Sequence, residues 1–330
     1  TGSNNIAIGY NSLGANTTAS NNTAVGYASL AANTTGTFNA SVGSLSLDAN
    51  TTGANNTALG YAALSANTTA NRNTAVGTSS LLVNTTGANN TGIGVLALGA
   101  NTTASNNTAV GDSALELNTT GGNNTAVGYQ ALDANTTGAD NLALGAVALS
   151  ANTTASSNTA VGESALKVTT TGAHNTAVGA AAGDALTTGS NNTIIGKGAA
   201  TNQTTAGNNT VVGMGAGGTI IDASSCILLG YEANVSGTGN SELVIGTSVV
   251  GKGDNTGLIY PPGGGGIYNA GNTTAWQQTS DERIKKNIKD NTTGLDVINQ
   301  IKVRNFEYRT EDEITEVPSE AAIDKQGVQL

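Results

Sequence analysis

Glycine returns at every 17th position of this chain from Gly9 to Gly230. Each of these glycines lies in a close variant of the phrase NNTAVGYxALxANTTGx. So strict a period indicates one small structural unit stacked on copies of itself. It predicts a rod built from repeats for most of the chain, so that any other activity belongs to the segment after the repeats.

The composition favours ordered repeats over a disordered chain. Charged residues make up 10% of the chain and aromatic residues 3%, while the repeats are rich in Gly, Asn, Thr and Ala. A disordered polar chain has no reason to keep Val and Leu in fixed columns. The net charge of −10 argues against a nucleic-acid partner. Because the chain opens inside a repeat, we expect it to be part of a longer protein.

Residues 21–37 show what one repeat contains. Thr23–Val25 have strand character, and Gly26 ends them. Ser29–Ala31 predict a second short extended piece, and Asn33–Gly36 predict a turn, since Asn and Gly tolerate left-handed backbone angles. Seventeen residues with Gly, Asn and paired Thr do not support a helix.

Two apolar columns are predicted to point into the coil. One contains Val25, Val42, Leu59 and their equivalents, and the other contains Leu30, Leu64, Leu132 and their equivalents. A third column, of small residues such as Ala24 and Ala58, suits close packing either inside the coil or at a three-fold axis. The position after each repeat glycine holds residues as different as Tyr27, Ser44 and Lys197, which indicates solvent.

These patterns predict an all-β fold, a parallel β-solenoid (β-roll) of 17-residue rungs. Rungs are expected to stack at about 4.8 Å, with Val and Leu filling a narrow interior. Asparagine columns are expected to stack their side-chain amides along the turns.

The phrase NNTAVGYASL resembles the repeats of trimeric autotransporter adhesin heads and of phage tail-fibre shafts. This resemblance implies a homotrimer of β-rolls. The adhesin repeats are shorter than 17 residues, so the turns must differ.

The pattern changes toward the C-terminus. Gly183 and Ala200 replace the Leu column, and the glycine spacing falls to 16 between Gly230 and Gly246. We predict a β-solenoid shaft over residues 1–250, a Gly/Pro-rich neck over 251–279, and a small α+β segment over 280–330.

The stretch SDERIKKNI, residues 280–288, is similar to the start of the intramolecular chaperone domain of phage endosialidases and tail fibres. The matching residues are Ser280, Asp281, Arg283, Lys285, Asn287 and Ile288. The following LDVINQIKVRNFEYR matches too, whereas the family's next block, a glycine before an Ala-Gln-Glu phrase, is expected just after Leu330. The resemblance implies a domain that trimerises, guides folding of the fibre and then cuts itself off beside Ser280.

Self-cleavage would need an activated nucleophile. A serine hydroxyl attacks only when a base takes its proton, and a lysine amine can act as that base when burial lowers its pKa. Ser280 and Lys285 are candidates for these roles, with the cut placed between Ser280 and Asp281 and with Asp281 and Arg283 shaping the turn. Alternatively, Ser280 is a helix N-cap and Lys285 a solvated charge.

No external substrate, cofactor or metal site is expected. His174 occupies a turn position, and Cys226, the only cysteine, is predicted to be a small buried hydrophobe. No stretch is long and apolar enough to span a bilayer.

The predicted function is therefore that of a homotrimeric phage tail fibre. Its partners would be other tail proteins and a host-surface receptor, either glycan or protein, and its location the virion. The alternatives are a bacterial surface adhesin, which normally adds a heptad-repeat stalk, and an ice-binding solenoid based on rows such as Thr17, Thr34 and Thr51. Cleavage of glycans is disfavoured, because no paired carboxylates face a cleft.

Overall fold

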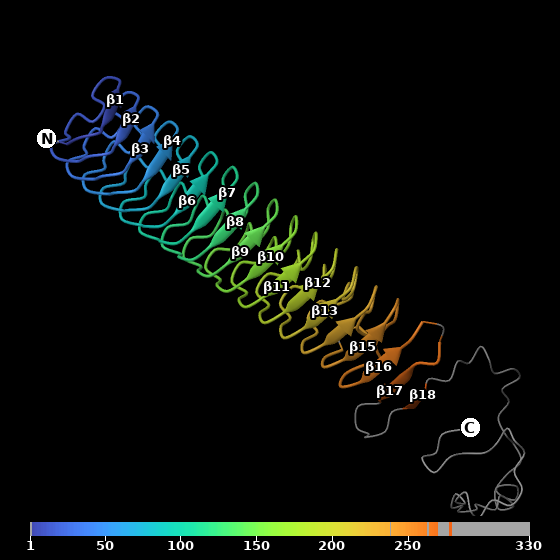
Figure 1. Ribbon diagram of the computed structural model, residues 1–330. Coiled ribbons are helices and arrows are strands. Elements are labelled where there is room, and N and C mark those ends of the chain that lie inside the picture. Colours follow the sequence, from blue (N-terminus) through green and yellow to red (C-terminus); the bar gives the residue numbers. More distant parts are fainter. Residues whose placement is uncertain (1, 238, 263, 270–276, 279–330) are drawn as a thin grey trace, which may run out of the picture. The chain divides into compact units, whose positions relative to one another are not determined.

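The computed structural model describes residues 2–237, 239–262, 264–269 and 277–278, which lie in the first of two units, Thr1–Ser280 and Asp281–Leu330. Within these residues the first unit is an all-β solenoid without a helix, as predicted (Figure 1). The strands are β1 (Ile6–Ile8), β2 (Thr23–Val25), β3 (Ala40–Val42), β4 (Thr57–Leu59), β5 (Thr74–Val76), β6 (Thr91–Ile93), β7 (Thr108–Val110), β8 (Thr125–Val127), β9 (Leu142–Leu144), β10 (Thr159–Val161), β11 (Thr176–Val178), β12 (Thr193–Ile195), β13 (Thr210–Val212), β14 (Ile227–Leu229), β15 (Leu243–Gly246), β16 (Gly257–Tyr260), β17 (Ile267–Asn269) and β18 (Gln277–Gln278).

Each strand from β1 to β15 pairs in parallel with the next strand along the chain. Thr23 lies opposite Ala40, and Thr57 lies opposite Thr74, so the partner is the equivalent residue 17 positions later. One repeat therefore makes one rung, and neighbouring rungs are held together by the sheet. This confirms the architecture predicted from the glycine period.

In strands β2 to β14 the three residues alternate between the inside and the outside of the solenoid. The middle residue of each is buried, and Ala24, Ala75 and Ala126 are all 0% exposed. The third residue points outward, and Val42 and Leu59 are 38% and 48% exposed. The prediction that this Val/Ile column points inward is therefore wrong. Since side chains alternate between the faces of a strand, the small-residue column and the Val/Ile column cannot both face the core.

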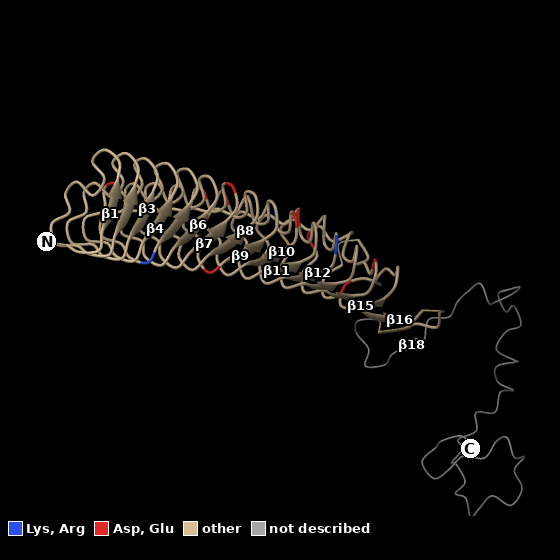
Figure 2. Ribbon diagram, turned by 45° about the horizontal axis from the view of Figure 1, so that its top comes forward, with Lys and Arg blue, Asp and Glu red and all other residues tan. Residues whose placement is uncertain are grey.

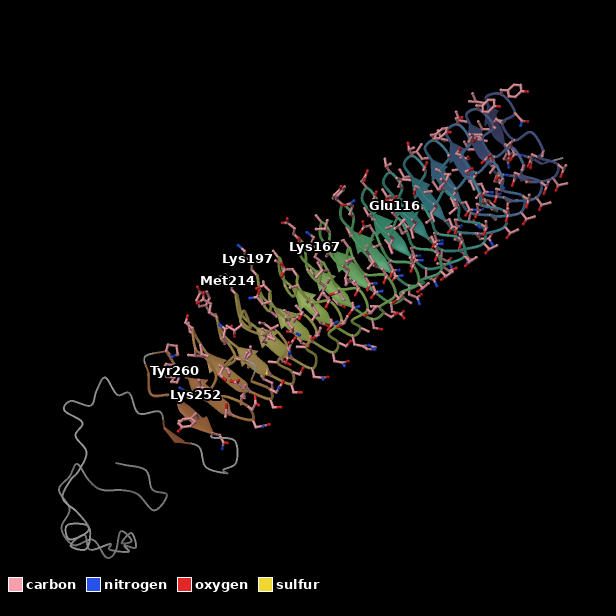
Figure 3. The ribbon with its side chains drawn as sticks, turned by 180° about the vertical axis from the view of Figure 1, so that it is seen from behind. Glu116, Lys167, Lys197, Met214, Lys252 and Tyr260 are labelled. Carbon is pink, nitrogen blue, oxygen red and sulfur yellow. The ribbon has the colours of Figure 1, made fainter. Side chains whose placement is uncertain are left out.

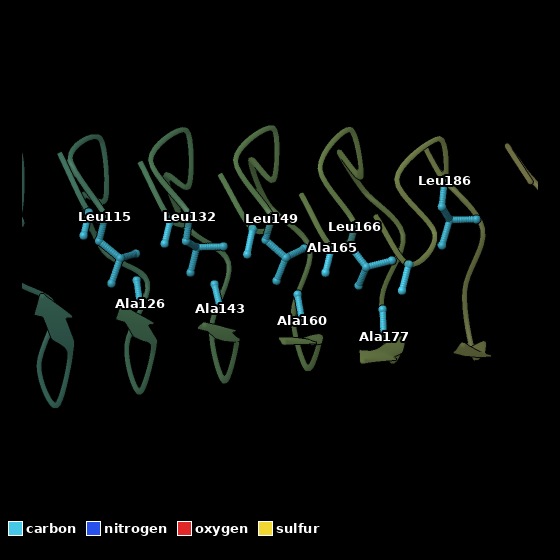
Figure 4. Packing of buried hydrophobic residues seen from close by; sticks show 14 of the residues in the cluster. Leu115, Ala126, Leu132, Ala143, Leu149, Ala160, Ala165, Leu166, Ala177 and Leu186 are labelled. Atoms are coloured by element: carbon cyan, nitrogen blue, oxygen red, sulfur yellow. The ribbon is translucent and has the colours of Figure 1, made fainter. Parts of the chain in front are cut away.

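Leucine fills the core from the other side of each rung. Leu30 and Leu132 are 0% exposed, as predicted for this column, and Figure 4 shows the leucines lying against the alanines. The predicted extended piece Ser29–Ala31 is instead a turn, because Ala28 and Leu30 have φ of 52° and 54°. This left-handed backbone is unfavourable for leucine on its own. Stacking holds it in place, since the N–H of Leu30 donates to the carbonyl of Ser46 in the next rung at 3.0 Å.

Two columns of buried asparagine run along the solenoid, as predicted. In the first, Nδ2 of Asn50 donates to Oδ1 of Asn33 and to the carbonyl of Gly53, both at 3.0 Å. In the second, the N–H of Asn39 donates to Oδ1 of Asn22 at 2.9 Å. These amides join neighbouring rungs and satisfy buried backbone groups of the turns, which would be costly to leave unpaired.

The core changes its composition at Gly183, where the Leu column ends as predicted. Leu186, in the first asparagine column, and Ile194, in the small-residue column, supply the missing apolar volume and are fully buried. A Cβ on Gly183 would lie 2.9 Å from Cδ1 of Ile194 and 3.1 Å from Cδ2 of Leu166. A larger side chain at Gly183 would therefore collide with the relocated core.

The rungs shorten before the parallel stack ends. Ile227 pairs with Leu243, 16 residues later, and Leu243 pairs with Gly257, 14 residues later. Strands β16 and β17 then pair in antiparallel fashion. Pro261 and Pro262 lie between these two strands and outside regular structure, as predicted.

Candidate interaction surfaces

The outer sheet face consists of the first and third residues of strands β1 to β16. Its first position is mostly Thr, its third is Val, Ile or Leu, and none of these strand positions is charged. Its most exposed aliphatic members are Ile6, Ile8, Val42, Leu59, Ile93, Leu144, Val178, Ile195 and Ile227. A long apolar stripe of this kind marks an interaction surface on a protein. Sequence reasoning missed it by assigning the third residue to the core.

A second exposed row follows the glycine that ends each strand. Five of its positions hold exposed tyrosines, Tyr10, Tyr27, Tyr61, Tyr129 and Tyr231. Tyr10 and Tyr27, in consecutive rungs, stack with ring centroids 5.7 Å apart and 10° between the ring planes. The prediction that this row meets solvent is confirmed at these tyrosines.

Charged residues are sparse over the described part of the chain (Figure 2). Glu116, Lys167 and Lys197 lie along one long side of the solenoid (Figure 3). Burial raises the pKa of Asp133, and the negative charge of Glu116 adds to the rise. Burial likewise raises the pKa of Asp184, against a smaller opposing effect of Lys167.

The histidine, the cysteine and the acidic residues of the described solenoid do not form larger clusters. His174 is exposed and Cys226 is buried, both as predicted, and burial raises the pKa of the Cys226 thiol. No three His, Cys, Asp or Glu residues among those described are grouped so that they could hold a metal ion. Nor do the described residues include a helix with the length and apolar character to cross a membrane.

The predicted self-cleavage residues lie outside the described residues. Ser280, Asp281, Arg283 and Lys285 all belong to residues 279–330, so their mutual geometry stays a prediction. The division of the C-terminal part into a neck over 251–279 and a segment over 280–330 also stays a prediction.

Comparison with known proteins identifies the C-terminal segment. Residues 280–325 match a protein family described as the chaperone of endosialidase. The match begins at Ser280, where the resemblance in the sequence placed the start of such a domain. No curated protein and no solved structure matches the chain. The chain thus combines a parallel β-solenoid with a C-terminal segment similar to an endosialidase chaperone.

Proposed function

We propose that this chain is part of a homotrimeric bacteriophage tail fibre, in which the solenoid holds a host-binding surface away from the virion. The observation that carries the proposal is the chaperone match at residues 280–325, directly after a β-solenoid. Chaperones of this type, by the resemblance stated above, trimerise and guide the folding of the β-structured fibre that precedes them. Host-surface receptors and other tail proteins would be its partners.

The outer sheet face supports assembly from three copies. Each rung from β1 to β14 contributes an exposed or half-buried aliphatic side chain at its third strand position, such as Leu59 or Ile93, and the rungs repeat at about 4.8 Å. Even a small apolar area per rung adds up along the solenoid, and packing against other copies would remove it from water. The absence of charges from these strand positions leaves no repulsion between like faces.

The segment after the solenoid would process itself once folded. Ser280 Oγ would attack the carbonyl carbon of the Ser280–Asp281 peptide bond, and Lys285 would take the hydroxyl proton and pass it to the departing amine of Asp281. The peptide C–N bond breaks, an ester forms, and water then hydrolyses it. The chaperone resemblance and the Ser280–Lys285 spacing support this step.

The fibre role is tested on virions. Gold-labelled antibody raised against residues 1–250 should decorate tail fibres in electron micrographs of the phage that encodes this chain. Labelling of the host cell envelope in uninfected cells, with none on virions, would instead favour the surface adhesin.

One observation bears on the ice-binding alternative. The turn threonines are engaged within the stack, since Oγ1 of Thr34 donates to the carbonyl of Thr51 at 3.0 Å. The strand threonines, such as Thr57 and Thr125, instead alternate with aliphatic residues on the outer sheet face. Three packed copies would cover that face. A monomeric chain that produces thermal hysteresis in freezing water would favour ice binding over the fibre.

A further inference from the structure

The row of exposed tyrosines contains a gap near the N-terminal end of the solenoid. The position after the repeat glycine holds Tyr27, Ser44 and Tyr61 in three consecutive rungs. The strands before these residues pair residue for residue, which keeps the three positions in register. Tyr27 and Tyr61 therefore project from the same edge of the solenoid two rungs apart, about 9.6 Å by the spacing of paired strands.

The neighbouring tyrosine pair gives the spacing of rings that lie one rung apart. Tyr10 and Tyr27, one rung apart, are nearly parallel with their centroids 5.7 Å apart. A ring placed above Ser44 would be one rung from Tyr27 and one rung from Tyr61, and so within stacking distance of both. The two tyrosines are 56% and 55% exposed, which leaves their rings accessible. Tyr129 has no such partner, because the positions two rungs away from it in the row hold Val95 and Glu163.

We propose that the gap between Tyr27 and Tyr61 binds a pyranose ring of a neutral saccharide. Tyrosine offers an apolar ring for the C–H face of a sugar and a hydroxyl for its polar rim, and Ser44 places another hydroxyl at the base of the gap. The row carries no charge from Tyr10 to Tyr61, so a neutral ligand fits better than an ion. Only the source of the saccharide, the host surface, rests on the proposed fibre function.

The test is isothermal titration calorimetry of the full chain with maltohexaose, cellohexaose and mannohexaose. At least one of these probes should bind the unaltered chain. Tyr27→Ala and Tyr61→Ala should each weaken that binding by roughly tenfold, the size of a lost ring contact. Tyr129→Ala removes an equally exposed tyrosine from the same row and should leave the affinity unchanged.

A fourth variant closes the gap without removing a tyrosine. Ser44→Tyr should fold normally, since the row accepts tyrosine in the adjacent rungs, and it should abolish binding while leaving the melting temperature unchanged.

The proposal is overturned if none of the three saccharides binds, if Ser44→Tyr still binds, or if Tyr129→Ala weakens binding as much as Tyr27→Ala. Binding of N-acetyltryptophanamide without saccharide would overturn it in favour of an aromatic side chain from a partner protein. The virion labelling described above decides the fibre role independently.

Discussion

Nδ2 of Asn101 donates to Oδ1 of Asn84, 17 residues earlier in the chain, at 2.8 Å. The same amide donates to the carbonyl of Ala104 at 3.0 Å, within its own turn. One buried side chain thus fixes both the spacing between two rungs and the shape of one turn. Because each rung contacts only its neighbours, such bonds make the stack cooperative along its axis.

Replacing Asn101 with alanine should destabilise the solenoid by about 2–3 kcal/mol, because buried hydrogen-bonding groups of the adjoining rung and turn lose their partner. The measurement is the urea unfolding midpoint followed by circular dichroism. Asn106→Ser, in an exposed column that already contains serine, should change stability by less than about 0.5 kcal/mol. A similar shift in both variants would show that the buried asparagines do not support the stack.

Leu132→Asp should destabilise the middle of the solenoid by about 4 kcal/mol or more, because it buries an unpaired charge. Tyr129→Ser, on the exposed row of the same rung, should have little effect. Thermal melting of the two variants compares the two sides of one rung directly. Equal losses would contradict the assignment of Leu132 to the core.

Ile93→Lys should separate the copies without unfolding the rungs, because Ile93 is 39% exposed on the outer sheet face. Light scattering at micromolar concentration should show three chains for the unaltered protein and mostly single 32.4 kDa chains for the variant. Tyr129→Lys, which adds the same charge outside this face, should stay trimeric. A monomeric unaltered protein would contradict assembly through this face.

Asp133→Asn should stabilise the solenoid at neutral pH. The raised pKa of Asp133 means that the folded state holds its proton more tightly than the unfolded state does. The carboxylate therefore costs no stability below the ordinary value of 3.8, and its cost grows as the pH rises toward the folded pKa. Melting temperatures of the variant and the unaltered chain should differ more at pH 7 than at pH 3. Asp112→Asn, at an exposed position, is the control, and an equal gain there would argue against burial as the cause.

Ser280→Ala and Lys285→Ala should each leave the full-length parent protein uncut but still trimeric, because folding guidance and cleavage are separable. Intact mass spectrometry after folding reports the cut, and light scattering reports the assembly. Cleavage that persists in Ser280→Ala would remove Ser280 from the mechanism. If the parent protein without substitutions forms a trimer and keeps its C-terminal segment, that segment is a permanent cap on the fibre.

The period and the column chemistry were enough to predict the rung, the buried leucines and the asparagine ladders. A column of leucine without polar substitutions is stable only in the core of a stacked coil. Asparagine recurs at its positions because the side-chain amides of successive rungs pair with one another. The prediction for the faces of the strand is wrong. Alternation within Thr23–Val25 means that only one of Ala24 and Val25 can face the core, and the smaller Ala24 takes that place.

Two other features lay beyond sequence reasoning. Left-handed Leu30 has no local signal, because leucine avoids this conformation and adopts it only where stacked rungs hold the backbone. The gap above Ser44 depends on the spacing of rings in adjacent rungs, and this became measurable only from the stacked pair Tyr10 and Tyr27.

The change of core residues at Gly183 divides the solenoid into two sections that differ in how well they tolerate the gain or loss of a repeat. Before Gly183, every rung packs a leucine against a small strand residue. When a 17-residue unit is duplicated or lost, the rungs that become neighbours therefore have matching core residues. After it, a copied leucine would collide with residues such as Ile194, and a rung moved the other way would leave a cavity. We therefore expect related chains to differ in length by whole rungs before Gly183 and to keep a constant number after it. In the proposed fibre, recombination could then change the length of the solenoid without changing the rungs that precede the chaperone-like segment.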